Sequence, residues 1–319
     1  MKKTGLLVLL LAGAAVAQQS TSTGASTPDS SGIVPTTASV PTVRYQTPTA
    51  ADLYCAGFIS KDRVANANFV DGGLQTPSTT KFTNGEIVYL SGTGYQPGQL
   101  YTILRELQDA NEYELFPGQA RLLKSTGHPY AEIGRVRVLD TRSHSAVAQV
   151  EFSCDPVNPG DIAVPFVEKQ PIAFHAPSHF DRFLPNTNKT SGRIVLGKDF
   201  DGTLGTGTKV YMNVGSNQGV KIGDYFRAVR YYRADLRDPV DSLSFKASTS
   251  EDTQKRPPSF EGNFLTRTNG PNIHMGDLPR RAVGEVVVLS VTPTTSTGMI
   301  VFALEDVHAG DMVELDEQQ

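Results

Sequence analysis

The sequence predicts an all-β protein with two tandem repeats of a small β-barrel or sandwich, preceded by a signal peptide and a disordered tether. Three observations support this prediction. Short runs that alternate apolar and polar residues are separated by turn residues throughout the chain. The 29 glycines and 20 prolines among 319 residues leave little room for long helices. The second half also repeats the first half at a constant spacing.

The N-terminus has the form of a secretory signal peptide. Lys2 and Lys3 precede an apolar run over residues 5–14, which is shorter than the ~20 residues that a bilayer-spanning helix needs. Residues 15–17, Ala-Val-Ala, have the small-x-small form of a cleavage site, so we expect cleavage after Ala17. An uncleaved anchor is the alternative. No other stretch is apolar enough to span a membrane, so we expect an exported bacterial protein of the periplasm or cell surface, with no transmembrane segment in its mature chain.

The chain then divides into four segments. Residues 18–50 are rich in Ser, Thr, Pro and Gly and bury too little apolar surface to fold, which predicts a disordered tether. We expect a first β-repeat domain over 51–168, a linker over 169–188 and a second β-repeat domain over 189–316. The second domain contains a polar loop over 234–279, which is the first candidate for a variable recognition element; residues 108–130 are the second.

The predicted strands fall into two sets of four. Those of the first repeat are 86–90, 101–104, 135–139 and 147–152, and those of the second are 209–214, 225–229, 285–289 and 298–302.

The two sets align as copies of one unit. Residues 134–164 lie over 284–314 without a gap, at a spacing of 150 positions. The matching pairs are Gly134/Gly284, Val136/Val286, Val138/Val288, Leu139/Leu289, Phe152/Phe302, Val157/Val307, Gly160/Gly310 and Asp161/Asp311. Upstream, residues 88–90 parallel 210–212, the turn at Gly98 parallels that at Gly223, and residues 57–59 parallel 192–194.

The recurring Gly-Asp pairs indicate tight turns. Glycine adopts positive φ at no steric cost, and an aspartate side chain accepts a hydrogen bond from a nearby backbone N–H. We therefore interpret Asp161, Asp224 and Asp311 as turn formers and not as catalytic groups.

The segments 208–233 and 278–315 resemble a module of exported bacterial envelope proteins. Their pattern is an apolar strand, Gly-x-x-x-Gly-Val-x-x-Gly-Asp, a strand ending in Arg, a Gly-Glu-apolar strand, and Gly-Asp before a last strand. It is similar to the C-terminal domain of flagellar assembly protein T and to a module found with LysM domains. The first repeat departs from the pattern, since Gln99 replaces the Asp after Gly98. The resemblance implies a small β-barrel-like domain in the envelope and no enzymatic activity.

The chain has two cysteines, Cys55 and Cys154, and both lie in the exported part. A disulfide is the expected state of such a pair in an oxidising compartment, and two buried free thiols are the alternative. The bond would constrain the unfolded chain by up to ~4–5 kcal/mol for a loop of about 100 residues. The sequence predicts no metal site at these cysteines.

Composition argues against nucleic-acid binding. The formal net charge is −4, and the basic pairs 255–256 and 280–281 are isolated. We expect no nucleic acid partner.

Two motifs that suggest chemistry have stronger structural interpretations. Residues 199–204, Asp-Phe-Asp-Gly-Thr-Leu, match the nucleophile loop of haloacid-dehalogenase-type phosphatases. That loop follows a buried parallel strand in an α/β fold, whereas this segment falls between strands of a β-repeat. His175 and His179 are four residues apart, but Pro177 between them opposes the helix on which they could share a metal ion.

Tyrosines supply the candidate binding surface. Tyr225, Tyr231 and Tyr232 surround one predicted strand, and Tyr101 lies in the matching part of the first repeat. Exposed tyrosines stack on sugars or pack on a protein partner, although packing in an ordinary β-core explains them as well.

The sequence therefore predicts a non-catalytic scaffold or binding module for another envelope component, either a protein or a wall polymer. A peptidoglycan- or polysaccharide-binding module is the main alternative, and a phosphatase that uses residues 199–204 is a third. We predict no catalytic residues, no cofactor and no metal. Edge strands of two small β-domains leave oligomer formation open.

Overall fold

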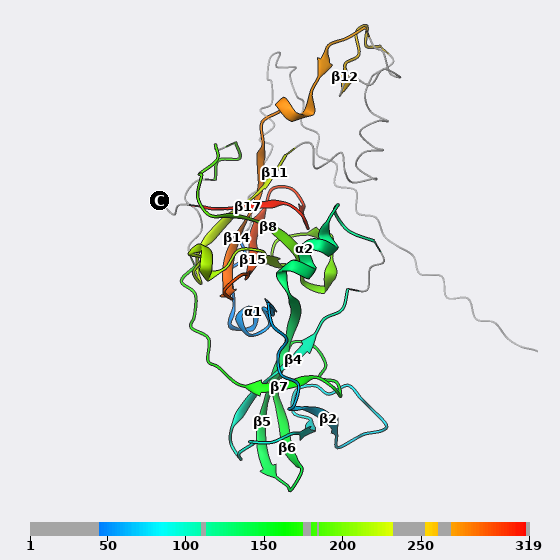
Figure 1. Ribbon diagram of the computed structural model, residues 1–319, viewed down its shortest axis with the longest axis vertical. Helices are drawn as coiled ribbons and strands as arrows, with labels where there is room; N and C mark the ends of the chain where they lie inside the picture. Colours follow the sequence, from blue (N-terminus) through cyan, green and yellow to red (C-terminus); the bar gives the residue numbers. More distant parts are fainter. Residues whose placement is uncertain are drawn as a thin grey trace, which may run out of the picture. The chain divides into compact units, whose positions relative to one another are not determined.

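The computed structural model describes residues 45–109, 113–174, 180–183, 185–231, 253–260 and 269–316 (Figure 1). The predicted signal peptide, most of the tether, residues 175–179 and most of the predicted loop 234–279 lie outside this part of the chain. Within the described residues, none of the helices has the length and apolar character needed to span a bilayer.

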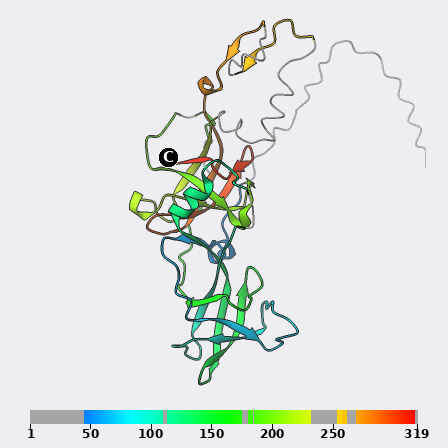
Figure 2. The ribbon, with the colours of Figure 1, turned by 45° about the vertical axis from the view of Figure 1, so that its right-hand side comes forward.

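The first barrel closes from six antiparallel strands. In their order around the barrel these are β5 (His128–Thr141), β4 (Leu100–Glu106), β7 (Ile162–Pro165), β2 (Phe69–Gly73), β3 (Ile87–Ser91) and β6 (Ser145–Ser153). Pairing of β6 with β5 closes the ring. β5 and β6 form the long green hairpin of Figure 2. A short strand outside the ring, β1 (Phe58–Ser60), pairs with the first residues of β5.

The second barrel is also a closed ring of antiparallel strands. In order these are β14 (Arg281–Val291), β11 (Tyr225–Arg230), β17 (Met312–Leu315), β8 (Ser191–Gly197), β10 (Lys209–Met212) and β15 (Ser296–Ala303). Two small pairs accompany it, β9 (Thr203–Leu204) with β16 (Val307–His308) and the parallel pair β12 (Ser259–Phe260) with β13 (Asn272–Ile273). The fold is thus all-β, with two tandem barrels, as the sequence predicts.

The two rings have the same strand order and the same register. β5 and β6 pair from Gly134 opposite Ser153, and β14 and β15 pair from Gly284 opposite Ala303, so the spacing of 150 positions recurs residue by residue. Both hairpins carry irregularities at equivalent points, after Arg135 and after Glu285. A Cβ on Gly134 would overlap the Phe152 carbonyl oxygen, and one on Gly284 would lie 2.7 Å from that of Phe302. Glycine is therefore required at both positions.

Upstream, two predicted correspondences are confirmed and one is wrong. The turns at Gly98 and Gly223 match, because their amides donate to the equivalent carbonyls of Val138 and Val288. Val88 pairs with Ala148 as Val210 pairs with Gly298, which confirms the match of 88–90 with 210–212. The equivalent of Ile194 is Val70, however, because the Val70 amide donates to Asp161 O as the Ile194 amide donates to Asp311 O. Residues 57–59 instead enter β1, outside the ring. A three-residue strand after a glycine is too short a pattern to specify its partner.

Each barrel encloses its own apolar core. Val88, Ile103 and Val136 are fully buried in the first, and Val210, Phe226 and Val286 are fully buried in the second. Alternate residues of the strands point inward, which leaves the outer faces of the strands to contact other elements.

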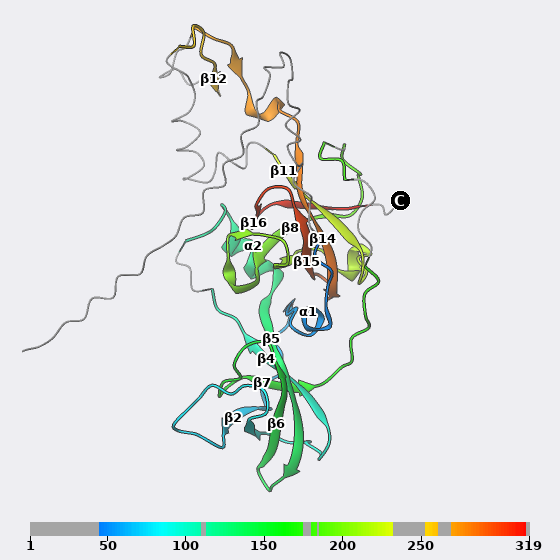
Figure 3. The ribbon, with the colours of Figure 1, turned by 180° about the vertical axis from the view of Figure 1, so that it is seen from behind.

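The segments outside the rings join the two barrels. α1 (Ala50–Tyr54) lies beside β14 and β15 of the second barrel (Figure 3). Its Leu53 packs with outer residues of these strands. Ile59 of β1 packs with Leu196 and Tyr211 of the second barrel, although β1 pairs with β5 of the first. The sequence had predicted residues 51–60 within the first domain and did not predict this role.

The excursion over 108–130 contains a helix that the strand pattern did not predict. α2 (Gln119–Thr126) lies against β8, and the Gln119 side chain donates to the Val195 carbonyl at 3.0 Å. This contact again joins an element of the first repeat to the second barrel.

The predicted disulfide is present. Cys55 and Cys154 are bonded, with their Cα atoms 5.9 Å apart. Cys55 follows α1 directly and Cys154 follows β6, so the bond ties α1 to the first barrel while Leu53 packs on the second.

Candidate ligand-binding pocket

The Gly-Asp turns form the most regular polar feature of the repeats. Asp161 receives two hydrogen bonds from Arg105, at 2.8 and 2.7 Å, and Asp311 receives two from Arg230, at 3.0 and 2.7 Å. Arg105 lies one residue before the end of β4, and Arg230 is the last residue of β11. Each of these strands pairs with the strand that follows the aspartate. Each aspartate also accepts a hydrogen bond from the backbone amide of the residue three positions before it, as Asp224 does from Lys221.

These contacts support the interpretation of the three aspartates as structural. The side chains of Asp161 and Asp311 are buried and use both oxygens in ion pairs, so they hold strand ends together. The paired arginines stand in the sequence at the ends of predicted strands, but only the closed ring shows that they meet these aspartates.

The Asp-Phe-Asp-Gly-Thr-Leu segment forms a turn between β8 and β9. Asp199 and Phe200 adopt positive φ values of 63° and 62°, and Leu204 is buried opposite Val307. Within the described residues, no group of three or more His, Cys, Asp or Glu side chains is placed to hold a metal ion. The segment therefore occupies the turn position predicted from the repeat.

The four candidate tyrosines do not share an exposed face. Tyr101 and Tyr225 are 3% and 2% exposed, because their side chains pack into buried apolar clusters. Tyr231 is 45% exposed. Tyr232 lies outside the described residues. The Tyr101 hydroxyl donates to Gln99 Oε1 at 2.9 Å, which satisfies it locally. Burial removes Tyr101 and Tyr225 from any candidate binding surface.

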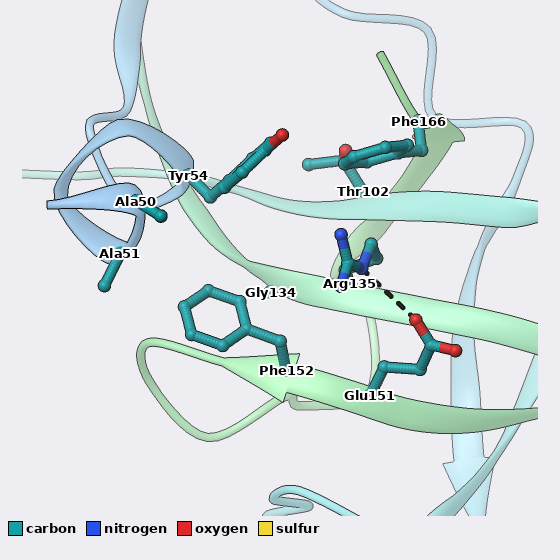
Figure 4. Close-up of a pocket in the computed structure, with 9 residues that line it drawn as sticks. All are labelled: Ala50, Ala51, Tyr54, Thr102, Gly134, Arg135, Glu151, Phe152 and Phe166. Atoms are coloured by element: carbon teal, nitrogen blue, oxygen red, sulfur yellow. Dashed lines mark ion pairs between the residues drawn. The ribbon is translucent and has the colours of Figure 1, made fainter. Parts of the chain in front are cut away.

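A pocket occurs instead on the outer face of the first barrel, where α1 approaches β4, β5 and β6 (Figure 4). Its volume is about 320 Å³. It is lined by Ala50, Ala51, Tyr54, Thr102, Gly134, Arg135, Glu151, Phe152 and Phe166. The pocket thus combines three aromatic rings with one pair of opposite charges.

Arg135 is the central polar group of this pocket. Its guanidinium lies over the rings of Phe166 and Tyr54, with its central carbon 5.0 and 6.0 Å from their centroids. Arg135 Nε lies 3.3 Å from Glu151 Oε2 but makes no hydrogen bond. Glu151 also pairs with Arg137. Two guanidinium groups therefore share one carboxylate, which leaves this face with a surplus of positive charge.

α1 forms a fixed wall of the pocket. Thr49 and Asp52 form a reciprocal capping box at its start, and Lys209 of the second barrel pairs with Asp52. Burial opposes the ionisation of Asp52, but hydrogen bonds from Lys209 and Thr49 outweigh it and hold the pKa of Asp52 below its usual value. At the other end, the Lys169 ammonium donates to the Leu53 carbonyl at 2.7 Å.

The equivalent face of the second barrel has different residues. The shared register places Arg227 where the first barrel has Thr102, Glu285 for Arg135, and Phe302 for Phe152. Asp316 takes the place of Phe166, since both amides donate to the equivalent strand residue.

These differences between the repeats place a cluster of buried charged side chains on the equivalent face of the second barrel. Arg227 donates to Asp316 at 2.6 Å. Burial, reinforced by the nearby charge of Asp316 and opposed by that of Arg227, raises the pKa of Glu285 to about 8. The Tyr45 and Phe180 rings pack edge-on against Phe302, with centroids 4.9 and 4.7 Å away.

The sequence contained only part of the information needed to find the pocket. Phe152 appears in the repeat alignment as the partner of Phe302, which marks it as structurally important but not as part of a pocket. Tyr54 and Phe166 lie 98 and 14 residues away from it and carry no motif.

Comparison of the chain with models of known protein families gives no match, and comparison with curated protein sequences gives none either. The resemblance to the module of flagellar assembly protein T therefore stays a prediction.

Proposed function

We propose that this chain is an exported, non-catalytic protein of the cell envelope that acts as a scaffold or binding module for another envelope protein. The observation that carries the proposal is the preformed pocket on the first barrel. Its aromatic rings offer packing surface, and its two charged groups, Arg135 and Glu151, are paired with each other beside those rings. Pockets with mostly apolar walls and a few placed polar groups are typical of binding sites.

The link between the barrels supports a scaffold role. α1 packs on the second barrel, lines the pocket of the first and is tied to the first by the disulfide. A ligand in the pocket would therefore contact an element that both barrels hold. Preorganisation of this kind lowers the entropy lost on binding.

Two observations support export. The first residues have the form of a signal peptide, and the cysteines form a disulfide, which is typical of proteins that fold in oxidising compartments. The periplasm or cell surface is the location that we propose.

A peptidoglycan- or polysaccharide-binding module is the second candidate. The observation that favours it is the exposure of Tyr54, Phe152 and Phe166 to one cavity, since sugar rings pack on aromatic faces. The volume of about 320 Å³ suits one sugar ring better than an extended chain.

A crosslinking pull-down with the mature protein, residues 18–319, against fractionated envelope of its host tests both candidates. The pocket variant Phe166→Ala and the surface variant Leu139→Ala, which removes an exposed side chain away from the pocket, run in parallel. The scaffold proposal requires capture of a defined protein that survives wall digestion, and loss of that protein with Phe166→Ala alone assigns its binding to the pocket. Sedimentation with purified wall polymer, lost with the same variant, would support the polysaccharide candidate. Equal capture by both variants would refute a role for the pocket.

A further inference from the structure

The second barrel shows how this fold occupies the face that forms the pocket in the first barrel. Phe180, from the segment between the barrels, packs on Phe302 and lies under the Arg227 guanidinium, whose central carbon is 5.9 Å from the ring centroid. Two residues later, the Arg182 carbonyl accepts a hydrogen bond from the Ala282 amide of β14 at 2.8 Å. A short segment of the chain itself, residues 180–183, thus places an aromatic ring on this face and adds a backbone contact to the barrel.

The first barrel retains the base of this arrangement. Phe152 stands where Phe302 stands, and a guanidinium is again present, although Arg135 on β5 supplies it in place of a residue on β4. Where Phe302 has the rings of Tyr45 and Phe180 against it, Phe152 lines a cavity of about 320 Å³.

The volume and charge of the cavity define what it can hold. Ligand pockets range over about 300–1,000 Å³, so this cavity has room for one side chain and not for a large ligand. The rings of Phe152, Phe166 and Tyr54 favour an aromatic side chain. Arg135 and Arg137 share the single carboxylate of Glu151, which favours an acidic group beside that ring.

We infer that the pocket of the first barrel receives an aromatic side chain, flanked by a carboxylate, from a peptide segment of a partner protein. This inference rests on the proposed function and names the chemistry of its partner. The aromatic ring packs on Phe152 and Phe166, and the carboxylate pairs with Arg135. The arrangement reproduces between two proteins the contact that Phe180 makes within this chain.

The absence of tryptophan from this protein allows a direct test, because a tryptophan in a peptide then reports on binding without background. The probe is the blocked hexapeptide Ser-Gly-Trp-Asp-Gly-Ser, titrated with the mature protein, residues 18–319, and followed by fluorescence and anisotropy. We expect saturable binding. Two control peptides are expected to bind less tightly. One has Asn in place of Asp and is titrated directly, and the other has Leu in place of Trp and is measured as a competitor of the probe.

Three variants and one matched control locate the site. Phe166→Ala is expected to raise the dissociation constant about tenfold, because an aromatic contact and its buried area are lost. Arg135→Gln is expected to raise it about fivefold for the Asp peptide and less for the Asn peptide. Ala51→Phe fills the cavity from the exposed surface of α1 and is expected to abolish binding. Arg142→Gln removes an exposed guanidinium that pairs with Asp140 and does not line the pocket, and we expect less than about a twofold change.

The melting temperature of each variant separates loss of the site from loss of the fold. Equal affinity for the Trp and Leu peptides, or equal effects of Arg135→Gln and Arg142→Gln, would overturn the inference. Displacement of the probe by wall saccharides but by no aromatic peptide would do the same. If the pull-down still captures a protein with Ala51→Phe, the inference is wrong while the scaffold function stands. If the peptide binds as expected but the pull-down captures no protein, the pocket chemistry stands and the proposed function is wrong.

Discussion

The paired Gly-Asp turns allow the contribution of a buried ion pair to be measured against internal controls. In the second barrel, Asp311 and Arg230 are 4% and 6% exposed and share two hydrogen bonds, and Arg230 also donates to the Asp306 carbonyl at 2.6 Å. We expect Asp311→Asn to remove the negative charge that the buried Arg230 guanidinium contacts through two hydrogen bonds. Loss of one partner of a buried ion pair costs about 3–5 kcal/mol, and we expect a loss of unfolding free energy in this range.

Two other turn aspartates provide the comparison. Asp161→Asn removes the equivalent partner of Arg105, but the Arg105 side chain is 30% exposed, so solvent compensates in part and we expect about 1–3 kcal/mol. Asp224 accepts the same type of backbone hydrogen bond, from Lys221 at 2.8 Å, but within the described residues no arginine pairs with its carboxylate. Asp224→Asn should therefore cost about 1 kcal/mol or less.

Urea unfolding of the mature protein with its disulfide intact, followed by circular dichroism, measures the three variants under one protocol. The order of destabilisation should be Asp311, then Asp161, then Asp224, with an unchanged dependence on urea concentration. Equal effects of Asp311→Asn and Asp224→Asn would refute the reasoning, because the ion pair with Arg230 would then add nothing to the turn contact that both variants lose.

Three further predictions follow from other parts of the fold. Replacing both Cys55 and Cys154 by Ser is expected to lower the unfolding free energy by about 3–5 kcal/mol. Urea unfolding under oxidising and reducing conditions measures this loss, and equal stability of variant and wild type in oxidising buffer would contradict the prediction. The pKa of Glu285 is raised to about 8 from an ordinary 4.5, so the folded state binds this proton more tightly than the unfolded state does. The contribution of Glu285 to stability is therefore full below about pH 4.5 and declines as the pH rises to 8. Glu285→Gln should remove this decline in unfolding curves measured at several pH values, and an unchanged slope would refute the prediction. Gly134→Ala should lower the melting temperature by several degrees, because the new Cβ meets the backbone of β6, whereas Gly205→Ala has open space around it and should have little effect.

The candidate site was only partly predictable from the sequence. The repeat alignment identified Phe152 and Phe302 as equivalents, and the structure confirms that match through the register of both hairpins. The pocket depends on differences between the copies, such as Phe166 in place of Asp316, and on Tyr54 from α1 outside the repeat. No local pattern in the sequence joins these residues, because their contact requires closure of the barrel and docking of α1.

The tyrosines illustrate the same limit. Alternation along a strand predicts that neighbouring residues face opposite sides, but it does not specify what covers the outer side. Tyr101 is buried in the core cluster of the first barrel, and Tyr225 is buried where α1 and the segment between the barrels cover the second. Long-range packing therefore determined the exposure of these two side chains.

The sequence by itself determined the all-β fold, the two repeats and the positions of the turns, because these depend on local alternation, on glycine at positive φ and on aspartate bonded to its own turn. It also determined which cysteines could pair, since the chain has only two. The tertiary structure alone decided the Arg105–Asp161 and Arg230–Asp311 pairs, the attachment of α1 to the second barrel and the pocket on the first barrel. Each of these requires residues far apart in the chain to meet, and closure of a ring of strands is the physical step that brings them together.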